Sequence, residues 1–194
     1  MIIGVDEAGR GCMAGPLVAA AVCLDGPIHG LSDSKRLSPA ARERLMIEVQ
    51  SQACSIGIGW VPAAQVDEIG LTQATSSAMR QAVRACKATL PSGRSIDQII
   101  IDGNYNYLEE LDNVETVIKA DAKHPEVMAA SIIAKVSRDA YMKQLSKRYP
   151  EYGFEKHFGY VTPGHIEACR ESGPIPGVHR YSYKTIKDTV SDHG

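Results

Sequence analysis

Apolar and polar positions along the chain predict strands and helices that alternate. Short apolar runs bounded by glycine, proline or charged residues are typical of buried strands, and apolar residues spaced three or four positions apart are typical of helices. The predicted strands cover residues 2–5, 17–24, 55–61, 99–101 and 115–120, and the predicted helices cover 38–53, a stretch opening at 62–64, 75–87 and 125–147. We expect the first two strands to pair antiparallel, because a glycine-rich turn joins them. The pattern predicts an α/β fold.

Composition narrows the class of protein. A chain of 194 residues that is 44% hydrophobic can bury one sizeable core, so we expect a single domain over residues 1–194, with a polar tail that frays from about residue 188. The longest apolar run, residues 17–24, is too short to span a bilayer, so no membrane partner is expected. Five cysteines without a CxxC pair indicate a reducing, cytoplasmic location. A net charge of −2 neither favours nor excludes a nucleic-acid partner.

Carboxylates stand where three predicted strands end. Asp6 and Glu7 follow the first strand, Asp102 follows the fourth, and Asp121 follows the fifth. Because ligand sites gather at the carboxyl ends of neighbouring strands, these four side chains are expected to meet. The alternative is that each Asp serves only a turn or a helix cap, a frequent use of this residue.

Four carboxylates in one cleft repel each other unless cations are present. Two divalent ions can hold one phosphodiester, activating a water on one side and stabilising the leaving oxygen on the other. An all-carboxylate set of ligands favours Mg²⁺, which Mn²⁺ can replace. The residues therefore predict a metal-dependent phosphodiester hydrolase.

Several motifs in the chain resemble those of the ribonuclease HII family, the type 2 ribonucleases H. They occur in order along about four fifths of the chain: GVDEAGRG at 4–11, AGP at 14–16, DSKRLS at 33–38, IDG at 101–103, KADAKHPEVMAASIIAKVSRD at 119–139 and YGFEKHFGY at 152–160. The resemblance implies a ribonuclease H-like fold, a five-stranded mixed sheet flanked by helices, with a C-terminal helical segment. It also implies an endonuclease that cuts the RNA strand of RNA–DNA hybrids and cuts 5′ to single ribonucleotides in duplex DNA, leaving 5′-phosphate and 3′-hydroxyl ends. The expected cellular task is ribonucleotide removal during DNA replication and repair.

The resemblance also implies roles for individual residues. The family's catalytic, metal-binding quartet falls on Asp6, Glu7, Asp102 and Asp121. Substrate contacts are implied for four further residues: the backbone of Gly9, Arg10 and Gly11 is expected to meet the ribose 2′-hydroxyl, and Tyr160 to stack on the following deoxyribose.

Basic residues near these motifs are candidates for phosphate contacts. Lys35 is the strongest of them, and Lys119, Lys123, Lys135 and Arg138 surround Asp121 in the sequence.

Some positions depart from the family pattern or carry no assigned chemistry. Cys12-Met13 replaces a common Pro-Leu, which puts the rigidity of the turn in doubt, and Phe158 replaces a usual lysine, which removes one phosphate contact. The histidines show no zinc-binding spacing, and His179-Arg180 resembles a C-terminal family pair to which we assign no chemistry.

Two other functions remain open at this point. One is a hybrid-binding module that has lost catalysis, and the other is a ribonuclease H-like phosphotransferase or ATPase. The intact acidic quartet disfavours the first, and the lack of a GxxxxGKS loop disfavours the second. We expect a monomer with no obligatory protein partner.

Overall fold

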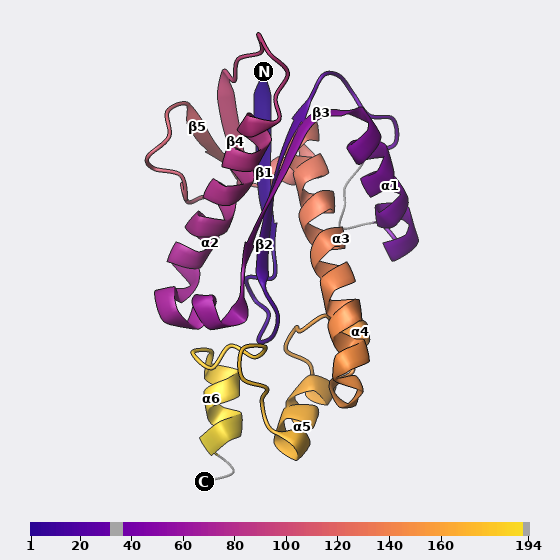
Figure 1. The fold of residues 1–194 in the computed structure, drawn as a ribbon, viewed down its shortest axis with the longest axis vertical. Coiled ribbons are helices and arrows are strands. Elements are labelled where there is room, and N and C mark those ends of the chain that lie inside the picture. The colour runs from indigo at the N-terminus through magenta and orange to yellow at the C-terminus, as the bar shows by residue number, and fades with distance from the viewer. Residues whose placement is uncertain (32–36, 192–194) are drawn as a thin grey trace.

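The computed structural model describes residues 1–31 and 37–191, and a five-stranded mixed sheet forms its centre (Figure 1). The strand order is β3-β2-β1-β4-β5. β1 pairs antiparallel with β2 and parallel with β4, which in turn pairs parallel with β5. The strands are β1 (Ile2–Ala8), β2 (Leu17–Leu24), β3 (Ala53–Val61), β4 (Gln98–Asp102) and β5 (Val114–Val117). The predicted α/β class and the antiparallel pairing of the first two strands are confirmed.

Helices cover both faces of the sheet. Figure 1 shows α2 (Ala63–Ala88) on one side and α3 (Pro125–Arg148) on the other, with α1 (Pro39–Gln52) next to α3. β2 is buried along its whole length because it lies between these two layers, which explains why it is apolar rather than alternating. No helix within residues 1–31 and 37–191 has both the length and the apolar character that a membrane span needs.

The helices α1 and α3 begin where the sequence predicts, whereas α2 is one kinked helix in place of the two predicted stretches. Ser38 caps α1 by accepting the Ala41 N–H at 3.2 Å, and Pro125 occupies the first turn of α3. The two helical stretches expected between residues 62 and 87 are joined through Gly70, whose φ of 77° produces a kink. The kink separates a short segment near the sheet edge from the longer body that packs on the sheet.

The C-terminal part forms a small helical layer below the sheet in the view of Figure 1. It contains the short helices η3 (Pro150–Tyr152) and α4 (Phe154–His157), followed by α5 (Pro163–Ser172) and α6 (Lys184–Ser191). Its apolar side chains pack on Met13 and Ala14 of the loop after β1. Within the tail that is predicted to fray from residue 188, α6 continues to Ser191 and Thr189 is buried.

Candidate active site

The parallel pairing of β1 with β4 brings two of the acidic segments together. Val5 lies opposite Ile101, so Asp6 and Asp102 come next along the two paired strands. The expectation that Asp6 and Glu7 follow the first strand is wrong, because β1 continues to Ala8 by pairing Asp6 with Ala20 and Glu7 with Ala19 of β2. Gly4 allows α3 to pack closely on β1, because a Cβ at this position would lie 2.2 Å from the backbone of Glu126 and would push α3 away from the strand. The first turn of α3 therefore lies directly against the strand that carries Asp6.

Asp121 reaches the same place by a different route from the one predicted. β5 ends at Val117, Lys119 adopts a left-handed conformation with φ 59°, and Asp121 lies in the 3₁₀ turn η2 (Ala120–Ala122) that precedes α3. The Asp102 carboxylate accepts the Ala120 N–H at 2.7 Å, which holds this turn against the end of β4. The expectation that Asp121 directly follows a strand is thus wrong, but its approach to the other acids is explained.

The electrostatics show that the four carboxylates form one cluster. Asp6 is 9% exposed, and burial raises the pKa of its carboxyl well above the usual 3.8, with further increases from the charges of Glu7, Asp102 and Asp121. The Glu7 N–H donates to Asp6 at 2.7 Å and offsets part of this effect. The raised pKa shows that negative charge is gathered at this edge of the sheet.

A cavity of about 320 Å³ opens onto this cluster. Among its lining residues are Asp6, Glu7 and Asp121, the turn formed by Gly9, Arg10 and Gly11, and Tyr160, while Asp102 lies outside the lining. The cavity is also lined by Ala8, Arg42, Ser131 and Lys135. A larger hollow of about 480 Å³ runs along α2, but it contains none of the four acids, so the smaller cavity is the candidate site.

The Gly9–Gly11 turn has one glycine that the fold requires and one that it does not. Gly9 has φ +96°, and a Cβ there would lie 2.2 Å from the Nε of Arg138. Among the described residues beyond its two chain neighbours, none has an atom within 4 Å of where a Gly11 Cβ would be, so the exposed backbone at Gly11 is open to a ligand. The Arg10 side chain turns aside, with Nη1 3.8 Å from Glu7 and the guanidinium carbon 5.4 Å from the centre of the Tyr107 ring.

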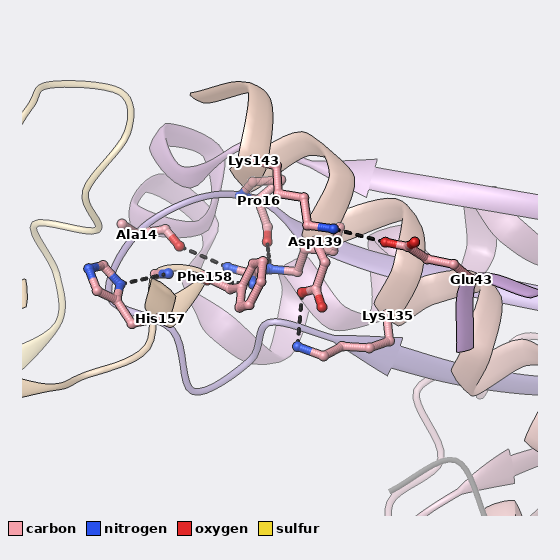
Figure 2. Close-up of polar contacts among 10 residues, drawn as sticks. Ala14, Pro16, Glu43, Lys135, Asp139, Lys143, His157 and Phe158 are labelled. Atoms are coloured by element: carbon pink, nitrogen blue, oxygen red, sulfur yellow. Dashed lines mark hydrogen bonds and ion pairs between the residues drawn. The ribbon is translucent and has the colours of Figure 1, made fainter. Parts of the chain in front are cut away.

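Tyr160 also lines the cavity. Its side chain is 41% exposed, and its backbone forms an antiparallel bridge with Cys12. The Nζ of Lys135 lies 5.3 Å from the centre of the ring and also pairs with Asp139 at 2.9 Å (Figure 2). A half-exposed ring beside a cation suits stacking on a sugar next to a phosphate.

The two departures from the family pattern have structural explanations. Cys12 and Met13 are fully buried, and the Met13 N–H donates to the Gly159 carbonyl at 2.9 Å, so packing fixes this part of the turn. Phe158 has φ 50°, and the Nζ of Lys135 lies 5.2 Å from the centre of its ring. A cation therefore lies above the position where the expected lysine is missing.

The structure corrects the interpretation of some basic residues. Arg138, expected near a phosphate, is fully buried and donates to the carbonyls of Pro16, Phe158 and Ala14 at 2.8–2.9 Å, which lie together in Figure 2. Lys35 lies outside the described residues. Arg42 lines the cavity, and sequence reasoning missed it because it belongs to no motif; its position in the first turn of α1 was the only available signal.

A buried cluster formed by His165, Cys169 and His179 was also missed, since the spacing of these residues gives no zinc motif. Their ligand-type atoms lie within 4.8 Å of one another. His165 Nδ1 must donate to the Tyr160 carbonyl at 2.9 Å, and His179 Nδ1 must accept the Ile175 N–H at 2.8 Å. His179 Nε2 therefore carries a hydrogen and donates to His165 Nε2 at 3.1 Å. These bonds satisfy both rings without a metal, and they fix the backbone of Tyr160.

Comparisons with known proteins identify the family of this chain. The family model for ribonuclease HII matches residues 3–186. A ribonuclease HII of Geobacillus sp. (strain WCH70) is 48% identical over 97% of this chain and 66% of its own length. A ribonuclease HII of Marinomonas sp. (strain MWYL1) is 44% identical over 96% of this chain and 92% of its own length.

Solved structures show the same fold. The crystal structure of ribonuclease H2 from Pyrococcus horikoshii OT3 matches with a TM-score of 0.77 and 27% identity, over 98% of this chain and 97% of that chain. The ribonuclease HII in the PCNA complex from Archaeoglobus fulgidus matches with a TM-score of 0.74 and 30% identity, over 97% of this chain and 96% of that chain. The fold is therefore ribonuclease H-like, and the chain belongs to the ribonuclease HII family.

Proposed function

We propose that this protein is a divalent-metal-dependent endonuclease that hydrolyses the RNA strand of RNA–DNA hybrids and cuts 5′ to single ribonucleotides embedded in duplex DNA. The observation that carries the proposal is the convergence of four carboxylates: Asp6, Glu7 and Asp121 line one cavity, and Asp102 lies close enough for its charge to raise the pKa of the buried Asp6. Family membership supports the same reaction.

The chemistry of the acidic quartet fits divalent cations. Oxygen is the ligand that Mg²⁺ and Mn²⁺ prefer. The pKa of Asp6 is raised first by burial and then by the negative charges of its neighbours, and a bound cation would compensate for both. Cations bound there would supply activation of water and stabilisation of the leaving 3′-oxygen. The protein's own part is to hold four carboxylates at one sheet edge: β1 fixes Asp6 and Glu7, and β4 and the turn η2 fix Asp102 and Asp121.

The residues that line the cavity support an RNA-containing duplex as the substrate. The Gly9–Gly11 turn presents backbone without side-chain cover at Gly11, which suits close approach of a ribose 2′-hydroxyl. Tyr160 lines the same cavity and would stack on the sugar that follows the ribonucleotide. Lys135 and Arg42 would add positive charge along the phosphate backbone, and Lys35 is proposed for the same role.

The biological setting follows from this activity. We propose ribonucleotide removal in replication and repair, performed by a monomer in the cytoplasm, where all five thiols of the chain remain free. The A. fulgidus relative was solved with PCNA, so a clamp partner belongs to that protein, and for this chain we propose none that is obligatory.

A cleavage assay with matched variants tests the proposal. A duplex with one internal ribonucleotide is incubated with Mg²⁺, Mn²⁺ or chelator, using wild-type protein, Asp102→Asn, and Asp112→Asn as a control for the same change on an exposed loop. We expect metal-dependent cutting on the 5′ side of the ribonucleotide by the wild type and Asp112→Asn, and a loss of at least a hundredfold in Asp102→Asn, as for other electrostatic groups at reacting centres.

Other outcomes point to the two alternatives. Tight binding of the duplex without cutting by the wild type would indicate a hybrid-binding module. ATP hydrolysis without cutting would indicate a phosphotransferase. Undiminished cutting in chelator would contradict the metal mechanism itself.

A further inference from the structure

The carbonyl of Arg10, in the middle of the Gly9–Gly11 turn, is held from behind by two side chains that lie more than 160 residues away in the sequence. Arg180 Nη1 donates to this oxygen at 3.2 Å, and the Tyr183 hydroxyl donates to it at 2.6 Å. Arg180 Nη1 also donates to the Tyr183 oxygen at 2.8 Å. The three groups form a closed triangle of hydrogen bonds.

The pair Arg180 and Tyr183 is itself firmly anchored. Arg180 is fully buried, and its Nε and Nη2 donate to the Gly15 carbonyl at 3.1 and 2.9 Å, while its backbone N–H donates to Met13 at 2.8 Å. Every hydrogen bond that the structure gives its guanidinium goes to a backbone carbonyl or to Tyr183. Asp67 of α2 accepts the N–H groups of Tyr181 and Ser182 at 2.7 and 2.9 Å, which fixes the segment between them.

The planarity of the peptide bond transmits this anchoring to the substrate side. The C=O of Arg10 and the N–H of Gly11 belong to one trans peptide unit, so they point in opposite directions. A carbonyl held inward therefore aims the Gly11 N–H away from Arg180 and Tyr183, and Gly11 itself is exposed. A charged donor on the carbonyl also polarises the unit and strengthens its N–H as a donor.

We propose that Arg180 and Tyr183 are positioning residues for ribonucleotide recognition. By holding the Arg10 carbonyl, they present the Gly11 N–H to the 2′-oxygen of the ribonucleotide. This inference rests on the proposed function and adds to it the residues that set the preference for ribose over deoxyribose.

The test compares two Tyr→Phe variants of the same segment. Tyr183→Phe removes the bond to the Arg10 carbonyl, whereas Tyr181→Phe removes a hydroxyl that donates to Pro174 at 2.5 Å, away from the turn. Each is combined with Asp102→Asn, and affinity is measured for a duplex with one ribonucleotide and for the same duplex made only of DNA. Cutting is measured separately in the background that keeps Asp102.

We expect Tyr183→Phe to reduce the ratio of the two affinities about fivefold, the typical weight of one hydrogen bond, and to reduce kcat/KM for the ribonucleotide duplex similarly. Arg180→Met is expected to reduce both further, and Arg180→Lys, which keeps one charged donor, to recover part of the loss. Tyr181→Phe should match the wild type in both measurements. Thermal unfolding of each variant checks that it is folded.

Three results would overturn the inference in distinguishable ways. If the wild type does not cut the duplex, the proposed function fails and the inference falls with it. If the wild type cuts and Tyr183→Phe behaves like Tyr181→Phe, only the inference fails. If Tyr183→Phe weakens binding of the two duplexes equally, the hydroxyl supports the fold and not ribose recognition.

Discussion

Acidification should destabilise this protein through two buried histidines. Burial lowers the pKa of His165 from 6.5 to about 3 and that of His179 to about 4. Both rings are fully buried, and the backbone contacts of Tyr160 and Ile175 raise these values only in part. Because the folded pKa lies below the unfolded value, this contribution to stability is complete above about pH 6.5 and is lost as the pH falls toward 4 and 3.

The magnitude follows from the linkage between protonation and folding. At pH 5 an unfolded histidine is almost fully protonated, whereas the folded rings are almost entirely neutral. Each histidine then lowers the free energy of unfolding by about 2 kcal/mol between pH 8 and pH 5, so the pair lowers it by about 4 kcal/mol.

Urea unfolding between pH 8 and pH 5, in the absence of divalent metal, measures this effect. Asp6, whose pKa is raised, takes up a proton in the folded state and so raises the free energy of unfolding as the pH falls. The change in the free energy of unfolding from pH 8 to pH 5 is therefore compared between the wild type and His165→Gln, which share Asp6. We expect the variant to lose about 2 kcal/mol less than the wild type, and a control substitution of the exposed His29 by Gln to follow the wild type. An equal loss in His165→Gln and the wild type would refute the assignment of a buried, neutral ring at this position.

The remaining predictions concern the turn and the acidic cluster. Gly9→Ala should lower the free energy of unfolding by about 2–3 kcal/mol, because it combines φ +96° with a clash against Arg138, whereas Gly11→Ala should unfold like the wild type yet cut the ribonucleotide duplex at least tenfold more slowly. Equal free energies of unfolding for Gly9→Ala and the wild type, measured in urea, would contradict the first expectation. Full cutting activity of Gly11→Ala would contradict the second. Asp6→Asn should stabilise the metal-free protein by about 1–2 kcal/mol, since it removes a buried charge that its neighbours repel and keeps an acceptor for the Glu7 N–H. Thermal unfolding with and without Mg²⁺ should show a smaller metal-induced rise in Tm for Asp6→Asn than for the wild type, and an equal rise would argue against a metal at Asp6.

The sequence predicts the sheet and the meeting of the acids because both depend on local patterns. Each of the apolar runs of β1 and β4 leads into a carboxylate, Asp6 or Asp102, and the parallel pairing of the two strands brings these two residues side by side. The apolar run at residues 115–120 predicts a strand that leads up to Asp121, but β5 ends three residues earlier, at Val117. The left-handed Lys119, which ends that run, has no distinctive sequence signal.

The basic residues and histidines could not be assigned from the sequence for another reason. A surface arginine and a buried arginine look alike in a sequence, and only the converging carbonyls of Ala14, Pro16 and Phe158 show that Arg138 is structural. The contact between His165 and His179 likewise depends on the path of the chain after α5. Arg42 reaches the cavity because α1 lies beside α3, which is a tertiary feature.

The triangle at the Arg10 carbonyl has a consequence for biosynthesis. β1 and its acidic residues are translated first, whereas Arg180 and Tyr183 leave the ribosome more than 160 residues after Arg10. A polypeptide that stops before residue 180 would carry all four carboxylates but neither of the two side chains that hold the Arg10 carbonyl. The turn beside the acids is therefore complete only after the C-terminal helical layer has been synthesised and has packed against it.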